Sequence, residues 1–297
     1  MDTPVVLVIG SATLDVVDFG GRNRRKIGGV ATYAGVTFRR HGIDTAVAAN
    51  VAAADVPLFR LYTDEGLLWK NGPTPATTRF INRETGAGRV QEMPSAADPI
   101  RCGAWLAERP AIRHVHLGPL HPDDIHPDTL SLAASGRYFV SLDVQGYVRG
   151  VADGRIVPRV SDRLETALAA ADAVKADETE WALILAHFGS NTAGLRCRLG
   201  FGELLLTAGD RGGRLIGSDG RVIDYPPDPV PPGRIEDPTG AGDVFFSAYL
   251  AGRHHEGWTE RESLEHAARI ASLQVTGQYL TPASLSAGTE STEGWLS

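Results

Sequence analysis

The chain has 297 residues and a mass of 31.7 kDa, long enough to bury roughly 75% of the surface that the unfolded chain exposes. Its 42% hydrophobic and 22% charged residues are typical of a folded globular protein and exclude a disordered or fibrous one. The net charge of −7 and the isoelectric point near 5.7 provide no basic field, so we expect neither nucleic acid nor a membrane as a partner.

The amino terminus and the two cysteines predict a cytoplasmic protein. Residues 5–9, VVLVI, form an apolar run far shorter than a membrane helix of about 20 residues, and no basic segment of a secretion signal precedes them. Cys102 and Cys197 lie in no CxxC pair and at no zinc-site spacing. We therefore expect two ordinary thiols in a reducing compartment.

Short apolar segments bounded by Gly, Pro, Asp and Ser alternate with helical segments along the chain, the pattern of a parallel sheet buried on both faces. The predicted strands are residues 5–10, 45–50, 114–117, 138–142, 173–175, 203–207 and 214–216. The predicted helices, with apolar residues at helical spacing, are residues 32–41, 163–171, 179–188, 244–251 and 263–275. The fold class that follows is α/β, as one domain.

One region interrupts this alternation and predicts a β hairpin. In residues 77–82, TTRFIN, Thr78, Phe80 and Asn82 alternate with Arg79 and Ile81. A turn at residues 86–88 and a second segment, residues 89–93, follow. The proline-rich residues 226–232 are most simply an extended surface connector, because proline fixes φ. We expect an α/β body with a small β appendage.

The most informative segment is residues 237–243, DPTGAGD, directly before an apolar helical run. Gly240, Ala241 and Gly242 remove side-chain bulk where the backbone enters the helix, so their N–H groups can bind an anion at the positive end of the helix dipole. A carboxylate at Asp243, in the first turn, either caps the helix or takes a proton from a hydroxyl that attacks phosphorus. Spacing alone leaves both roles open.

Residues 237–250 resemble the carboxy-terminal signature of the ribokinase, or PfkB, family of sugar and nucleoside kinases, and seven consecutive matching residues make the signal specific. The resemblance implies a ribokinase-like three-layer α/β/α sandwich, a single domain over residues 1–297, with a mostly parallel central sheet and a small β lid formed by residues of approximately 12–27 and 72–93. It also implies that Asp243 is the catalytic base and that the backbone of Gly240, Ala241 and Gly242 stabilises the transferring phosphoryl group.

The first part of the chain resembles the acceptor side of these kinases. Residues 10–15, GSATLD, are similar to the family's first strand and its terminal Asp, so the resemblance assigns Asp15 to substrate hydroxyls; a solvated strand end is the simpler alternative. Gly28 and Gly29 resemble the Gly-Gly motif at the entrance to a helix beside the sugar. Tyr33 stands where the family usually has Asn, and it either contacts the substrate through its hydroxyl or packs within the helix layer.

The middle of the chain resembles the family's Asn-x-x-Glu motif, with Asp177 in place of Asn. Asp177 and Glu180 project from one side of a helix entry and could hold Mg²⁺ through water. They also match a capping box, which needs no ligand. The two roles are compatible.

Two further segments are assigned by resemblance to the phosphate donor and the substrate. Thr207, Gly209 and Gly212 are similar to the family's Thr-x-Gly-x-x-Gly segment beside the nucleotide, although an isolated string of this kind is usually a hairpin turn. Residues 143–149, DVQGYVR, resemble a segment of proteins close to the inositol kinases. Arg149 has a planar fork suited to phosphate oxygens or a carboxylate, and the alternative is a surface ion pair.

Two features do not follow the family or suggest other chemistry. Residues 50–57, NVAAADVP, lack the two glycines of the family's Val-Gly-x-Asp-x-x-Gly segment, so the wall on the substrate side is expected to be shorter or reshaped. Four histidines cluster in the sequence, at His114, His116, His121 and His126. Two of them precede prolines in turns and no Cys joins them, so a structural metal is not expected.

The sequence thus predicts an ATP-dependent kinase that phosphorylates a hydroxyl of a small polyol, sugar or nucleoside, with inositol or a sugar favoured. The resemblance implies ATP, Mg²⁺ and a monovalent cation such as K⁺ near the Asp237 loop. The chain is expected to be a monomer or a homodimer. The alternatives are a non-catalytic sensor that binds a nucleotide or polyol, a nucleoside kinase, and a kinase of hydroxymethylpyrimidine-type vitamins, which the hairpin disfavours.

Overall fold

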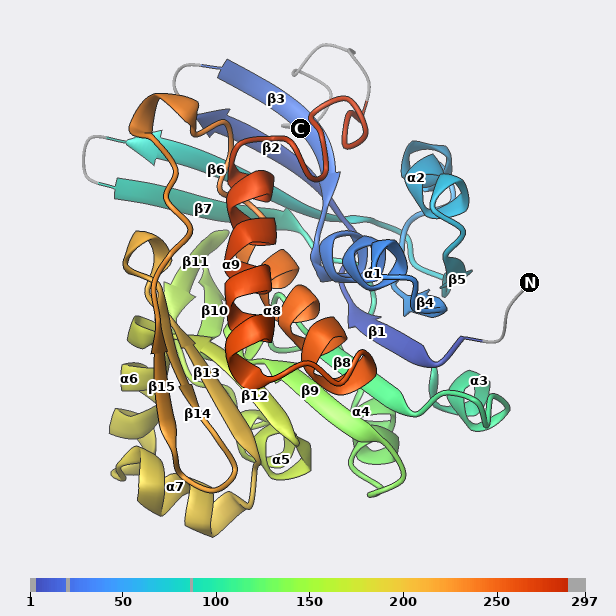
Figure 1. Cartoon of the computed structure of the whole chain (residues 1–297). Helices are drawn as coiled ribbons and strands as arrows, with labels where there is room; N and C mark the ends of the chain where they lie inside the picture. Colours follow the sequence, from blue (N-terminus) through green and yellow to red (C-terminus); the bar gives the residue numbers. More distant parts are fainter. Residues whose placement is uncertain (1–3, 20–21, 86–87, 288–297) are drawn as a thin grey trace.

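The computed structural model describes residues 4–19, 22–85 and 88–287. Within these residues a nine-stranded sheet has the order β15-β14-β13-β12-β9-β8-β1-β4-β5, and its strands from β13 to β5 are parallel (Figure 1). Its strands are β1 Val6–Gly10, β4 Thr45–Ala48, β5 Leu68–Lys70, β8 His114–Gly118, β9 Phe139–Asp143, β12 Ala173–Asp177, β13 Glu203–Thr207, β14 Gly213–Ile216 and β15 Val222–Tyr225. Strands β14 and β15 are antiparallel and form one edge.

Helices cover both faces of this sheet. One face carries α1 Val30–Arg40, α2 Arg60–Asp64, α8 Ala241–Leu250 and α9 Glu260–Val275, and the other carries α3 Gly103–Ala107, α4 Pro127–Ala133, α5 Leu164–Ala170, α6 Glu178–Phe188 and α7 Thr192–Leu199. Strand β1 shows why both faces are covered: Val6 and Val8 pack into the first core, and Leu7 and Ile9 into the second. Each such side chain contributes roughly 1.5–3 kcal/mol by burial.

A second sheet, here called the lid sheet, has the order β10-β11-β7-β6-β2-β3 within the described residues. Its strands are β2 Thr13–Phe19, β3 Arg22–Gly28, β6 Thr78–Thr85, β7 Gly88–Ser95, β10 Arg149–Ala152 and β11 Arg155–Pro158. The chain leaves the main sheet after β1, builds β2 and β3, and returns in α1 (Figure 1). Strands β2 and β3 overlap the predicted segment 12–27, and β6 and β7 overlap the predicted segment 72–93.

The predicted three-layer α/β/α body with a β lid is confirmed, and each predicted strand and helix exists with modest shifts at its ends. The predicted hairpin is β6 and β7, which pair antiparallel; residues 86 and 87 of its expected turn lie outside the described residues. The sequence interpretation missed the hairpin of β10 and β11. Its signal was the Asp153-Gly154 pair, whose positive φ values of 51° and 75° are those of a tight hairpin turn.

In the described part of the chain, no helix combines the length and the apolar character that a membrane crossing requires.

Close backbone packing at the carboxyl ends of β1 and β8 generates a stability prediction. Gly10 and Gly118 are register partners, and a Cβ on Gly10 would overlap the carbonyl oxygen of Gly118. We expect Gly10→Ala to lower the free energy of unfolding by about 1–3 kcal/mol, because buried backbone must move. Urea denaturation measures the change. Gly233→Ala is the control, since nothing lies within 4 Å of its Cβ; equal effects of the two variants would contradict the prediction.

Candidate active site

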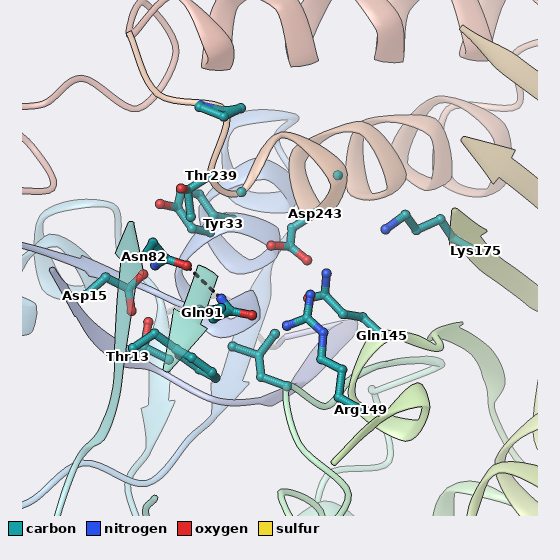
Figure 2. A pocket seen from close by; sticks show the side chains of 16 residues that line it. Thr13, Asp15, Tyr33, Asn82, Gln91, Gln145, Arg149, Lys175, Thr239 and Asp243 are labelled. Atoms are coloured by element: carbon teal, nitrogen blue, oxygen red, sulfur yellow. Dashed lines mark hydrogen bonds between the residues drawn. The ribbon is translucent and has the colours of Figure 1, made fainter. Parts of the chain in front are cut away.

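A cavity of about 150 Å³ lies where the lid sheet meets the body (Figure 2). It is lined by Thr13, Asp15, Gly29, Tyr33, Phe80, Asn82, Gln91, Leu120, Gln145, Arg149, Lys175, Pro238, Thr239, Gly240, Gly242 and Asp243. The cavity therefore brings together residues of the predicted acceptor side, the predicted anion site and Arg149. The residues that the sequence assigned to the nucleotide and to magnesium do not line it.

The loop before α8 opens a helix amino terminus onto this cavity. Gly240 has a φ of 81°, and a Cβ there would lie 2.5 Å from the ring of Tyr33, so this position requires glycine for both conformation and space. Within the described residues, the amides of Gly242 and Asp243 donate to no protein acceptor. The Ala241 amide, in contrast, donates to the carbonyl oxygen of Pro238 at 3.2 Å, which removes it from the expected set of anion-binding amides.

Asp243 lies in the first turn of α8, and its carboxylate points into the cavity toward Arg149 and Gln145 (Figure 2). Burial and the nearby Asp143 raise the pKa of Asp243 to about 7, although Lys175 and Arg149 act in the opposite direction. No ion pair of Asp243 occurs among the described residues. Near neutral pH this carboxyl group can accept and release a proton.

A buried ion pair beside the anion site was missed in the sequence. Lys175 in the middle of β12 and Asp143 at the carboxyl end of β9 are register partners, and their Nζ and Oδ2 atoms are 2.8 Å apart. Burial alone would lower the pKa of Lys175, but Asp143, Glu180 and Asp243 raise it above its usual value. A Cβ on Gly242 would lie 3.1 Å from Nζ, so a permanent positive charge adjoins the free amides. The available signal was a lysine near the end of a buried strand.

The acceptor side of the cavity comes from the lid sheet. The first strand ends at Gly10, and Asp15 lies in β2 rather than at the end of β1, where the sequence had placed it. A Cβ on Gly28 would overlap Oδ2 of Asp15, and Gly29, with a φ of 83°, begins the entry to α1. These contacts explain the Gly-Gly pair.

The lid hairpin adds polar groups that the sequence did not single out. Asn82 in β6 and Gln91 in β7 both line the cavity, and Nε2 of Gln91 donates to Oδ1 of Asn82 at 2.8 Å (Figure 2). The predicted hairpin located these residues, but only the pairing register shows that they face inward.

Tyr33 lines the cavity and packs against the loop that leads into α8. Its ring packs against Gly240, and its hydroxyl accepts a hydrogen bond from Nζ of Lys26 at 3.0 Å. Burial raises the pKa of Tyr33 to about 12, although Lys26 lowers it, so the phenol stays protonated. The tyrosine is therefore built into the wall between the cavity and the lid.

The predicted magnesium residues form the expected capping box of α6. The Glu180 amide donates to Oδ1 of Asp177 at 2.7 Å, and the Asp177 amide donates to Oε2 of Glu180 at 2.9 Å. Among the described residues, no group of three or more His, Cys, Asp or Glu side chains is placed to hold a metal. A Mg²⁺ ion held through water fits these residues, because protein-bound Mg²⁺ usually contacts one or two carboxylates and keeps several of its water ligands.

The predicted nucleotide residues lie next to this capping box. Thr207 and Asp177 are register partners on β13 and β12. Gly209 belongs to the short turn between β13 and β14, and Gly212 ends it, where a Cβ would overlap the carbonyl oxygen of Tyr225. The antiparallel turn that was the alternative for this segment is therefore present. This turn follows the carboxyl end of β13, and the cavity also lies at the carboxyl ends of the parallel strands.

Arg149 begins β10 and lines two cavities. The first is the cavity with Asp243, toward which its guanidinium group points (Figure 2). The second, of about 480 Å³, also includes His121, Asp123 and Arg159. A phosphate or substrate contact is compatible with this position.

The clustered histidines form hydrogen bonds within the fold, and the two cysteines form no disulfide in the described part of the chain. His114 and His116 both lie within hydrogen-bond distance of Oγ of Ser141, at 2.7 and 2.8 Å, and burial lowers the pKa of His116 to about 4. His126 accepts a hydrogen bond from the Asp128 amide at the start of α4. Cys102 is buried and Cys197 exposed, and both are free thiols.

The monovalent cation expected near Asp237 does not fit the groups there. Oδ2 of Asp237 forms an ion pair with Nζ of Lys26, and Oδ1 accepts the Thr239 amide at 2.9 Å. Although burial acts to raise it, Lys26 and these hydrogen bonds hold the pKa of Asp237 below its usual value. The carboxylate already has a cationic partner.

The raised pKa of Asp243 can be measured without any substrate. We expect carbon-13 NMR of the aspartate carboxyl groups to show one resonance that titrates near pH 7 and is absent from Asp243→Asn. Because the folded pKa exceeds the unfolded value of about 3.9, the stability of the wild type should fall relative to the variant as pH rises between these values. A titration of Asp243 near pH 4 would contradict the prediction.

Known proteins resemble this chain in sequence and in structure. Residues 113–286 match the pfkB family carbohydrate kinase model. A pyrophosphate-dependent kinase in the ribokinase family, complexed with a pyrophosphate analogue and myo-inositol, is 26% identical with a TM-score of 0.76, over 91% of this chain and 94% of that chain. A search of the curated proteins finds no significant match.

More distant structures share the fold. A Burkholderia thailandensis nucleoside kinase in complex with inosine has a TM-score of 0.71 at 19% identity, over 94% of this chain and 95% of that chain. A Vibrio cholerae fructokinase double mutant, with fructose, ADP and potassium bound, has a TM-score of 0.70 at 17% identity, over 95% and 96%. This chain therefore belongs to the pfkB family of carbohydrate kinases, enzymes that phosphorylate hydroxyl groups of small molecules.

Proposed function

We propose that this kinase phosphorylates a hydroxyl of a small polyol, inositol or a single sugar, with Asp243 as general base. The observation that carries the proposal is the position of the Asp243 carboxylate in the cavity, between lid side chains on one side and the free amides of α8 on the other. A base that lies between polar acceptor contacts and an anion site is what phosphoryl transfer to an alcohol requires.

The acceptor is inferred from the polar groups of the lid. Asp15, Asn82 and Gln91 present carboxylate and amide groups, which suit several hydroxyls of one ring. The neighbour at 26% identity contains myo-inositol, which supports inositol as the first acceptor to test.

The reaction follows from the charges around Asp243. The ionised carboxylate takes the proton of the acceptor hydroxyl. The hydroxyl oxygen forms a bond to phosphorus, and at the same time the bond from phosphorus to the donor's bridging oxygen breaks. The amides of Gly242 and Asp243 and the cations of Lys175 and Arg149 stabilise the charge of the transferring group. A pKa near 7 suits a base that works at neutral pH.

ATP is the proposed donor. Its nucleotide would lie beside Thr207, Gly209 and Gly212, and its Mg²⁺ would be held by Asp177 and Glu180 through water. The metal would neutralise phosphate charge there.

Pyrophosphate is a second candidate donor. The observation that favours it is the pair of cations, Lys175 and Arg149, that flanks Asp243, because these charges can hold a donor that has no base or ribose. The pyrophosphate-dependent neighbour adds support at 26% identity.

The proposal is tested by a screen of polyols, sugars and nucleosides with ATP or pyrophosphate as donor. We expect turnover with inositol or a sugar, and Asp243→Asn should lower kcat by about 10²–10⁴-fold while donor binding persists, because only the base is lost. Asp64→Asn, an exposed substitution in α2, is the control. Near-normal turnover of Asp243→Asn would remove the base assignment, and donor binding without turnover on any acceptor would support the sensor alternative.

The magnesium assignment has its own test. Glu180→Gln should raise the Mg²⁺ concentration for half-maximal rate by about tenfold, while the amide still serves the capping box. Glu178→Gln is the matched control, because Glu178 lies on the same helix but pairs with Arg211 at the surface. An unchanged magnesium titration of Glu180→Gln would exclude the role.

A further inference from the structure

Lys26 and Asp237 form a partly buried ion pair between the lid sheet and the loop that leads into α8. Their side chains are 8% and 20% exposed. Nζ of Lys26 also donates to the hydroxyl of Tyr33 at 3.0 Å, and the remaining oxygen of Asp237 accepts the Thr239 amide at 2.9 Å. Both carboxylate oxygens thus have partners inside the protein.

This ion pair anchors the loop that carries the amides proposed to bind the phosphoryl group. The Asp237 carboxylate holds the turn at Thr239, three residues before Gly242. On the other side, the amides of Glu236 and Asp237 donate to the carbonyl oxygen of Val275 in α9, at 3.0 and 3.2 Å. A buried carboxylate without a cationic partner is strongly unfavourable, so loss of the ammonium would displace this loop.

The same ammonium also faces the acceptor side. Lys26 and Asp15 are cross-strand partners in β3 and β2. Burial alone would lower the pKa of Lys26, but Tyr33, Asp237 and Asp15 raise it above its usual value. Lys26 therefore carries a permanent charge between the acceptor carboxylate and the phosphoryl-binding loop.

We propose that the Lys26 ammonium is the built-in monovalent cation of this loop, so that the kinase needs no added K⁺. A metal cation at Asp237 would stand close to Nζ of Lys26 and meet repulsion between like charges, with neither carboxylate oxygen left unshared. The Vibrio cholerae fructokinase with potassium bound shows that the ion occurs in a relative of this fold. The part of this proposal that concerns the reaction rate rests on the proposed function.

The first arm compares the unaltered protein in KCl and in choline chloride at equal ionic strength. We expect kcat/KM to differ by less than about twofold between KCl and choline chloride at every concentration compared. Thermal unfolding without donor or acceptor should also show no potassium-specific shift of Tm. A tenfold or larger stimulation of the rate by K⁺ would overturn the proposal.

The second arm removes the charge with an unbranched side chain of similar length. Lys26→Met should lower kcat/KM by about tenfold or more, and K⁺ or NH₄⁺ should raise both its rate and its Tm relative to choline. Lys26→Arg keeps the charge and should remain insensitive to K⁺. Full activity of Lys26→Met in choline would overturn the proposal.

Arg24→Ala is the matched control. Arg24 lies on the same strand and pairs with Glu236 at 3.0 Å, but its side chain is 36% exposed. We expect its kcat/KM to stay within about twofold, because exposed ion pairs contribute little.

The measurement of Tm tests the built-in cation separately from the proposed kinase function, since it requires no turnover. If no acceptor is found, a potassium-dependent Tm of Lys26→Met with a potassium-independent Tm of the unaltered protein would still support a built-in cation. The same potassium response in both proteins would overturn it.

Discussion

Positive charge fixed at the amino terminus of α8 is the constraint on which the site depends. Lys175 lies beside Gly242 and is paired with Asp143, and Lys26 is paired with Asp237 at the other end of the same loop. An ammonium group can be buried only when a carboxylate compensates it, so each cation is held by its own anion. Asp243, in contrast, has no such partner among the described residues, and its carboxyl group remains available for proton transfer.

The connection between the two sheets explains why these charges meet. Strands β2 and β3 are inserted between β1 and α1, so Asp15 and Lys26 belong to the lid while the Gly28-Gly29 pair leads directly into the body. The lid sheet therefore lines the cavity and also contacts, through Lys26, the loop that leads into α8. A change in the lid can alter both of these parts of the site.

Tyr33 and Lys26 are best understood together. Tyr33 stands where related kinases usually have Asn, and its ring fills the space next to Gly240. Its hydroxyl accepts a hydrogen bond from Lys26, whose ammonium pairs with Asp237. The departure from the family at Tyr33 therefore belongs to a network that includes a cation supplied by the chain itself.

The sequence by itself determined the alternating elements and the lid hairpin, because periodicity is local, and its DPTGAGD segment marked the start of α8 as a candidate site. The tertiary structure decided which side chains meet. Lys175 and Asp143 are 32 residues apart and pair only through the register of β12 and β9, and Lys26 reaches Asp237 over 211 residues. The use of the Ala241 amide by Pro238 likewise depends on how the loop folds. Local sequence carries no record of strand register or of the cation that a distant carboxylate will meet, since both follow from the packing of the two sheets.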